Sequence, residues 1–170
     1  VHPATQITMS VCNGSYVLAM AGLLDGRTAT AHHGGYGMMR AMFPKVNLVR
    51  GKRWVEDGKL ATSGGLTSGQ DLALRVVERY FGREQARKTA IQLEYQGTGW
   101  MHPDSNAALA QRPVSTPEKP YCPVCEAQLA KPTGITFTYK GKTHMFCSED
   151  CKTTFIATPE RFLVSGGGIG

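Results

Sequence analysis

The chain has 170 residues, of which 41% are hydrophobic, and a formal net charge of +6. This composition excludes a mainly disordered chain and allows one medium domain, or a larger domain joined to a smaller one. No apolar run reaches the ~18 residues that span a bilayer, and the dispersed basic residues lack the dense stripe of a nucleic-acid interface, so we expect a soluble, cytoplasmic protein with no membrane or nucleic-acid partner.

The first hundred residues alternate strand and helix signals, which is typical of an α/β fold. Strands are expected where short apolar runs end at turn residues, over 6–11, 28–31, 46–49, 53–56 and 59–62. Asp57-Gly58 predicts a hairpin between the last two of these strands. Helices are expected from composition and helical spacing over 13–24, 35–43, 68–81 and 83–95.

Beyond this region the periodicity is lost, and four prolines gather between Thr98 and Pro120. Such a stretch is typical of an extended connector between two folded units. We therefore expect an α/β domain over 1–97, a connector over 98–119 and a small domain over 120–164. The glycine-rich residues 165–170 are expected to form a flexible tail.

The small domain contains two cysteine pairs, Cys122 with Cys125 and Cys147 with Cys151, separated by 21 residues. A first pair on a tight turn and a second at a helix start bring four thiolates to the corners of a tetrahedron, about 2.3 Å from a zinc ion. A β-hairpin over 135–146 would connect the two pairs. The alternative is two disulfides, for which four cysteines allow three pairings. We favour metal, with zinc first and copper or iron as other soft candidates. His144 lies near the second pair and is expected to be a packed or surface residue.

The stretch Tyr139-Lys140-Gly141-Lys142-Thr143-His144-Met145-Phe146-Cys147-Ser148, followed by Cys151, Phe155, Pro159 and Phe162, resembles the YHS domain family over about 45 residues. Members usually open with Asp-Pro-Val-Cys, and here Cys122 takes the Asp position. The resemblance implies a metal-binding module, and the substitution turns a three-cysteine site into a four-cysteine one. Closed coordination by four thiolates favours a structural role for the metal.

The fifth cysteine, Cys12, falls where an apolar strand turns into a helix, which is the geometry of a nucleophile elbow. Ser10 and Gly14 are small enough for the sharp turn. The start of a helix favours a thiolate, the reactive species, and the backbone N–H of Asn13 would point to the same place as an oxyanion donor. The alternative is a buried structural cysteine.

Two histidines end the next expected strand, His32 and His33, on the edge of a parallel sheet where the elbow would lie. Either could reach Cys12 as a base. His2 and His102 stand in proline-flanked loops and are expected to be solvated.

The segments SVCNGSYVLAMAGLLDGRTATAH and DGKLATSGGLTSGQDLALRVVERYFG resemble the ThiJ/PfpI superfamily, especially its isonitrile-hydratase-like and AraC-linked branches. The resemblance covers residue 6 to about residue 95 and implies the C-terminal half of a flavodoxin-like, glutamine-amidotransferase-like domain. It gives Cys12 the nucleophile position and His32 the partner position, with the same 20-residue spacing. His33 stands where a Trp is frequent. The absent half would hold an acidic partner of the cysteine and a second oxyanion donor.

Two functions follow as expectations. The first is a cysteine-dependent enzyme of hydrolase or hydratase type that acts on a small-molecule substrate and carries an appended metal module. The second is a non-catalytic metal-binding or redox- and stress-sensing protein that uses the α/β unit as an assembly scaffold. Since the strand over 6–11 needs a neighbour on each edge, we also expect an N-terminal half, as a separate chain or unread segment, and further association into a homo-oligomer.

Overall fold

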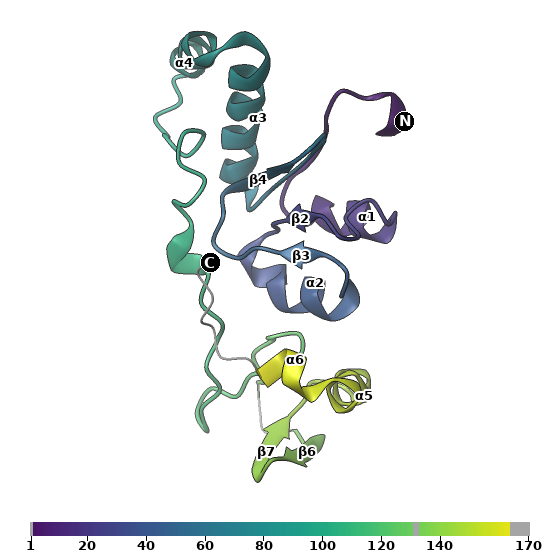
Figure 1. Ribbon diagram of the computed structural model, residues 1–170. Coiled ribbons are helices and arrows are strands. Elements are labelled where there is room, and N and C mark those ends of the chain that lie inside the picture. The colour runs from purple at the N-terminus through teal and green to yellow at the C-terminus, as the bar shows by residue number, and fades with distance from the viewer. Residues whose placement is uncertain (1, 131–132, 164–170) are drawn as a thin grey trace. The chain divides into compact units, whose positions relative to one another are not determined.

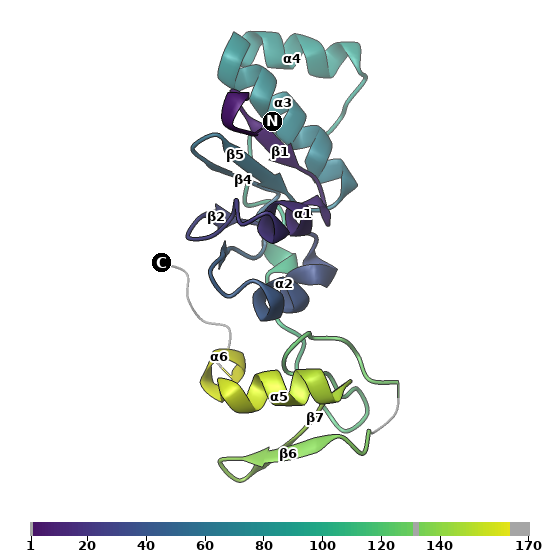
Figure 2. The ribbon, with the colours of Figure 1, turned by 90° about the vertical axis from the view of Figure 1, so that its right-hand side faces the viewer.

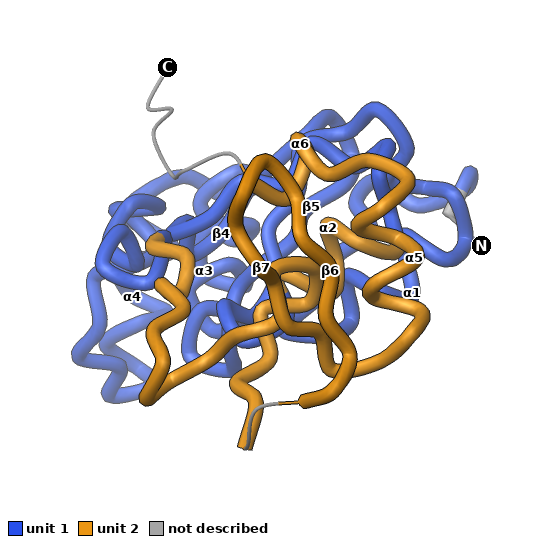
Figure 3. Tube along the Cα trace, turned by 90° about the horizontal axis from the view of Figure 1, so that it is seen from below, with its two compact units in different colours: residues 1–35, 43–110 blue, residues 36–42, 111–170 orange. Residues whose placement is uncertain are grey.

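A computed structural model describes residues 2–130 and 133–163, so the expected tail over 165–170 lies outside it. The chain divides into two compact units, which Figure 3 colours separately. Unit 1 comprises residues 1–35 and 43–110, and unit 2 comprises residues 36–42 and 111–170. Within the described residues, no helix has the length and apolar character needed to cross a membrane.

Unit 1 is built on two small sheets. Its strands are β1 (Thr8–Ser10), β2 (Thr28–Ala29), β3 (Asn47–Leu48), β4 (Trp54–Asp57) and β5 (Leu60–Ser63). The larger sheet has the order β1-β5-β4, in which β1 is parallel and β4 antiparallel to β5, and the smaller sheet pairs β2 with β3 in parallel. In the described part of the chain β1 pairs with β5 alone, so its outer edge carries no strand.

The predicted hairpin between β4 and β5 is confirmed. Asp57 pairs with Leu60, and Gly58 adopts φ +65°, the left-handed conformation that such a turn requires. All four residues of β5 are buried. The hydroxyl of Thr62 in β5 accepts the N–H of Thr30 at 2.8 Å and thereby ties the chain after β2 to the larger sheet.

Helices complete unit 1, with α3 packed against β4 and β5 (Figures 1 and 2). The α-helices are α1 (Gly14–Met20), α3 (Leu66–Phe81) and α4 (Arg83–Gln92), and single 3₁₀ turns occupy η1 (His2–Ala4), η2 (His33–Gly35) and η3 (Ala107–Leu109). Gly82 adopts φ +84° between α3 and α4, so the predicted break between the two helices is confirmed.

The expected connector over 98–119 is folded in its first part, up to Ala110, where it belongs to unit 1. Trp100 is only 3% exposed and packs with three residues of α3 and α4, namely Leu74, Ala86 and Ala90. The indole N–H of Trp54 also donates to the carbonyl of Gly99 at 3.0 Å. The prolines predicted an extended chain here, but burial of one large aromatic side chain fixes the segment on the core.

A buried polar group lies under this segment. The carboxylate of Asp71, on α3, is fully buried, forms an ion pair with Arg53 and accepts the hydroxyl of Tyr95 at 2.9 Å. Both carboxylate oxygens are therefore satisfied, as burial of a charge requires.

Unit 2 combines a hairpin with short helices: α2 (Tyr36–Met42), β6 (Thr136–Tyr139), β7 (Lys142–Met145), α5 (Glu149–Ala157) and α6 (Pro159–Leu163). The strands pair antiparallel, and Lys140 and Gly141 both adopt positive φ in the turn, as a type I′ turn requires. The core surrounds Phe146 and Phe155, both fully buried. The predicted hairpin is confirmed, whereas α6 was not predicted.

Candidate functional site

The loop after β1 has the conformation expected of a nucleophile elbow. Cys12 adopts φ +57°, which is uncommon and costly for a residue other than glycine. Its N–H donates to the carbonyl of Gly64 at 2.7 Å, and Gly14 N–H donates to the carbonyl of Val11 at 2.9 Å. The chain thus turns within three residues from β1 into α1, and the sharp bend is tied to the loop after β5.

Around the elbow, the backbone donors differ in availability. The N–H of Gly14 is already used by Val11, whereas the N–H of Asn13 has no hydrogen-bond partner in the described part of the chain. The carbonyl of Cys12 accepts the hydroxyl of Ser15 at 3.1 Å, which orients the strained peptide. The role of the Asn13 N–H as an oxyanion donor stays a prediction, while the N–H of Gly14 is used in the turn.

His32 lies beside the same glycine loop that holds Cys12. A Cβ placed on Gly65 would lie 3.3 Å from His32 Cδ2, and the preceding residue, Gly64, accepts the N–H of Cys12. His32 Nδ1 accepts the N–H of Gly34 at 3.1 Å, which leaves Nε2 to carry the proton of the neutral ring. Proton exchange between His32 and Cys12 stays a prediction.

The other histidines fit less well as partners. The ring centroid of His33 is 4.3 Å from that of His32, and the side chain is exposed. Partial burial and then the neighbouring His32 lower the pKa of His33. His102 is exposed in its loop, and the side chain of His2 lies outside the described structure.

Unit 2 brings the four remaining cysteines together. The sulfur atoms of Cys122, Cys125, Cys147 and Cys151 all lie within 4.8 Å of one another, and Cys147 Sγ is 3.5 Å from those of both Cys125 and Cys151. Four sulfurs around a zinc ion at ~2.3 Å have edges of about 3.8 Å. All four are free thiols here, so the cluster fits a tetrahedral metal centre.

Local structure explains how each pair is held. In the first turn, Glu126 N–H donates to the carbonyl of Cys122, and Cys122 N–H donates to the carbonyl of Ala127, both at 2.9 Å, with Glu126 at φ +62°. In the second, Ser148 caps α5 by accepting the N–H of Cys151. The predicted turn and helix start are thus both present.

Hydrogen bonds make Cys122 the most readily ionised thiol of the cluster. The Cys125 thiol, followed by the backbone N–H groups of Cys125, Cys147 and Val124, lowers the pKa of Cys122 to about 4, although burial acts in the opposite direction. The hydrogen bond that the Cys125 thiol donates to Cys122 raises the pKa of Cys125. Burial raises the pKa of Cys151 to about 11. Four adjacent thiolates repel one another, so a thiophilic cation is needed to keep all four deprotonated.

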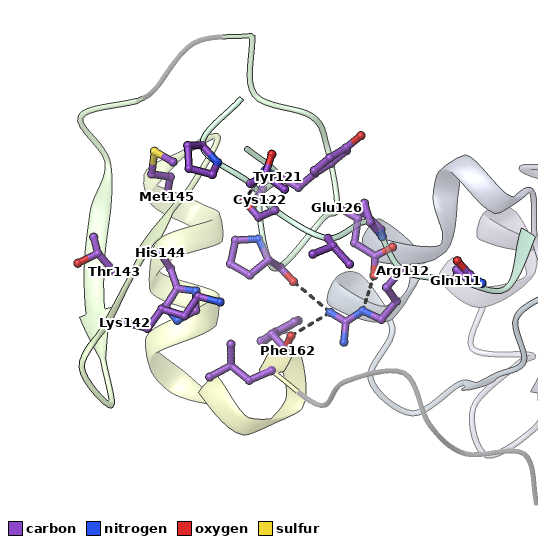
Figure 4. A pocket seen from close by; sticks show the side chains of 17 residues that line it. Gln111, Arg112, Tyr121, Cys122, Glu126, Lys142, Thr143, His144, Met145 and Phe162 are labelled. Atoms are coloured by element: carbon purple, nitrogen blue, oxygen red, sulfur yellow. Dashed lines mark hydrogen bonds and ion pairs between the residues drawn. The ribbon is translucent and has the colours of Figure 1, made fainter. Parts of the chain in front are cut away.

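The cluster is supported by residues that the sequence did not single out. Arg40 of α2 donates to the carbonyls of Pro123 and Val124, which lie between the first two cysteines, and Arg112 pairs with Glu126 at 3.0 Å. Figure 4 shows the Arg112 guanidinium at the edge of a pocket, bonded to Glu126 and to backbone carbonyls. No local signal marks these residues, because their partners lie far away in sequence or are backbone atoms.

That pocket has a volume of about 790 Å³, and all of its lining residues belong to unit 2. It includes Cys122 and His144. His144 is half-buried, with its ring centroid 5.1 Å from that of Phe155, and burial followed by Lys142 lowers its pKa. The residue packs beside the cluster and is not a fifth member of it, as the sequence indicated.

Comparison with known families agrees with both resemblances. Residues 2–79 match the DJ-1/PfpI family, and residues 122–165 match the YHS domain. Each match covers less than half of the chain. Together they confirm the mixed α/β assignment and the presence of a YHS domain at the C-terminal end.

Curated relatives align with the same N-terminal segment. An isonitrile hydratase from Pseudomonas putida is 41% identical over 87 residues, which cover 51% of this chain and 36% of that protein. The HTH-type transcriptional regulator GbdR of Pseudomonas aeruginosa (strain UCBPP-PA14) is 36% identical over 87 residues, covering 51% and 23%. The chain spans about a third or less of the length of these relatives.

Solved structures give weaker similarity. A ThiJ/PfpI family protein from Pseudomonas syringae has a TM-score of 0.48 at 31% identity, covering 54% of this chain and 36% of that one. Drosophila melanogaster DJ-1beta has a TM-score of 0.46 at 26% identity, covering 54% and 47%.

Proposed function

We propose, from the DJ-1/PfpI match over residues 2–79 and the YHS match over residues 122–165, that the chain belongs to a cysteine-dependent enzyme of hydrolase or hydratase type. The observation that carries this proposal is the positive φ of Cys12 at the bend between β1 and α1. A non-glycine residue in this conformation is costly, and such strain is concentrated at functional sites. The similarity to an isonitrile hydratase supports the assignment.

The reaction that these groups support is nucleophilic. His32 first accepts the proton of the Cys12 thiol, for which the hydrogen bond from Gly34 to Nδ1 has to open. The Cys12 thiolate then forms a C–S bond with an electrophilic carbon of a small substrate, and the electron pair displaced in that step takes the proton from the His32 imidazolium. Water then attacks the same carbon, His32 accepts a proton from the water, and the C–S bond breaks to restore the thiolate. The N–H of Asn13 would stabilise the charge that develops in between.

The four-cysteine cluster serves as a structural metal centre in this proposal. Cys122, Cys125, Cys147 and Cys151 would hold the ion, and zinc matches a closed set of four thiolates best. Bound metal would cross-link a small domain whose core by itself contributes little stability. Copper or iron remains compatible with the same soft donors.

A further segment would complete the α/β domain. The unpaired edge of β1, and the small share of each relative that the chain covers, both support an N-terminal half that adds a strand there, as a separate chain or as part of a longer one. Association of the completed domains into a homo-oligomer belongs to the same proposal. The size of the native particle tests it.

Activity of the full-length protein tests the enzymatic proposal. An isonitrile is the first substrate to try, with amides second, comparing the wild type with Cys12→Ala and His32→Asn. Both substitutions should abolish turnover while leaving the far-UV circular dichroism spectrum unchanged. Turnover that survives Cys12→Ala would exclude the proposed nucleophile.

A second function is favoured by the match to transcriptional regulators, since GbdR aligns over 87 residues with 36% identity. In that case the α/β unit would be a sensing scaffold, and Cys12 would respond to oxidation to a sulfenic or sulfinic acid. Hydrogen peroxide at low concentration would then modify Cys12 and change ligand binding or assembly, with no turnover of any electrophile.

A further inference from the structure

The helix α2 belongs to the metal-binding unit although it lies in the N-terminal half of the sequence, as the orange segments of Figure 3 show. Gly37 packs directly on the first cysteine turn: a Cβ at this position would lie 2.4 Å from the carbonyl oxygen of Cys125. Backbone cannot move aside easily at that distance, so the contact requires glycine. The YHS stretch thus receives part of its wall from a helix some eighty residues earlier.

Arg40 lies on the same helix and contacts the same turn. Its Nη2 donates to the carbonyl of Pro123 at 3.1 Å and to that of Val124 at 3.3 Å. The N–H groups of these two peptide units belong to Val124 and Cys125, and hydrogen bonding from both lowers the pKa of Cys122. Each peptide therefore has a guanidinium at its oxygen end and a thiolate at its hydrogen end.

We propose that Arg40 is a positioning residue for the metal centre, which fixes and polarises the two peptide groups that donate N–H···S hydrogen bonds to Cys122. A cation at a carbonyl oxygen increases the positive charge on the amide hydrogen, so the N–H···S bonds are strengthened in series. Groups that orient and tune metal ligands in this way affect metal affinity nearly as much as the ligands do.

The surroundings of Arg40 hold its side chain in this position. Glu126 forms an ion pair with it at 3.3 Å, and its guanidinium lies 5.0 Å from the centroid of the Phe162 ring. The side chain is 18% exposed, so solvent screens these contacts little. One nitrogen, Nη2, makes both carbonyl contacts and the ion pair, while the planar guanidinium lies over the Phe162 ring. The point charge of a lysine would not reproduce this combination of contacts.

The test uses the full-length protein with Zn²⁺ and Co²⁺ as probes. Zinc affinity is measured by competition with a chromophoric chelator, and the sulfur-to-cobalt charge-transfer band is recorded for the Co²⁺ form. The variants are Arg40→Met, Arg40→Lys and the control Arg87→Met, which removes the same charge from a side chain that is 64% exposed on α4.

We expect Arg40→Met to bind zinc roughly 10- to 100-fold more weakly and to shift the cobalt band to longer wavelength, because weaker N–H···S bonds leave the thiolate easier to oxidise. Arg40→Lys should fall between Arg40→Met and the wild type, and Arg87→Met should match the wild type. Zinc affinity within twofold of the wild type for Arg40→Met, or weaker affinity with an unshifted band, would overturn the proposal. If Arg40→Met does not fold, Arg40→Lys decides: wild-type values for both readouts would overturn it.

Discussion

The N–H of Cys12 donates to the carbonyl oxygen of Gly64 at 2.7 Å, so the bend after β1 is anchored to the loop after β5. The next residue of that loop, Gly65, lies beside the ring of His32. One glycine pair thus contacts both the strained cysteine backbone and the candidate base. The strain at Cys12 and its reactivity can be tested separately.

Cys12→Gly should be more stable than Cys12→Ala by about 1 kcal/mol, because the left-handed conformation costs a residue with a Cβ roughly 1–2 kcal/mol and glycine adopts it without strain. The greater conformational entropy of glycine in the unfolded chain offsets part of this difference. Both variants should lose thiol reactivity equally. Urea denaturation measures the difference. If Cys12→Gly is the less stable of the two, the φ of +57° is not a source of strain.

Asp71→Ala should destabilise unit 1 by about 3–5 kcal/mol, since it leaves the Arg53 guanidinium buried without its carboxylate. The side chain of Asp71 is fully buried, and that of Arg53 is 17% exposed. The matched control is Glu84→Ala, which removes a carboxylate that is 63% exposed and should cost less than about 0.5 kcal/mol. Equal urea midpoints for the two variants would contradict a structural role for Asp71.

Metal removal should lower the free energy of unfolding of unit 2 and leave that of unit 1 unchanged, because the thiolates would lose the ion that holds them together. Hydrogen exchange read by mass spectrometry after chelation should show loss of protection in residues 36–42 together with residues 120–163. Protection of α3 should persist. If α2 instead keeps its protection when the cysteine turns lose theirs, its contacts with the metal-binding unit are not maintained in solution.

The stability of metal-free unit 2 should depend on pH through three cysteines. Hydrogen bonds lower the folded-state pKa of Cys122 to about 4, below the ~8.5 of an unfolded cysteine. This contribution is fully present above pH ~8.5 and is lost as the pH falls towards 4. The raised pKa values of Cys125 and Cys151 have the opposite effect and lower the stability above pH ~8.5.

Unfolding of the reduced, chelator-treated protein should therefore show a stability maximum near pH 8.5. Replacing Cys122 with serine should flatten the acid side, since a hydroxyl does not titrate in this range. A curve that is flat between pH 5 and 8 in the wild type would show that the Cys122 thiolate is not preferentially stabilised in the folded state.

Much of this structure was predictable because the signals are local. The bend at Cys12, the hairpin at Asp57-Gly58 and the spacing of the cysteine pairs each depend on residues close together in the sequence. The prolines near Trp100 predict a connector, because the buried partners of Trp100 on α3 and α4 leave no local signal in the sequence. Arg40 has no local signal either, since its partners are carbonyl groups more than eighty residues away.

Native mass spectrometry after brief treatment with limiting iodoacetamide at neutral pH tests both proposed sites in one experiment, because it reports metal, disulfides and the reactive thiol together. We expect one zinc ion per chain and a single alkyl adduct, which peptide mapping places on Cys12. A metal-free chain whose mass is lowered by the hydrogens of two disulfides, or an adduct that falls on Cys122, Cys125, Cys147 or Cys151 while zinc is bound, would contradict it.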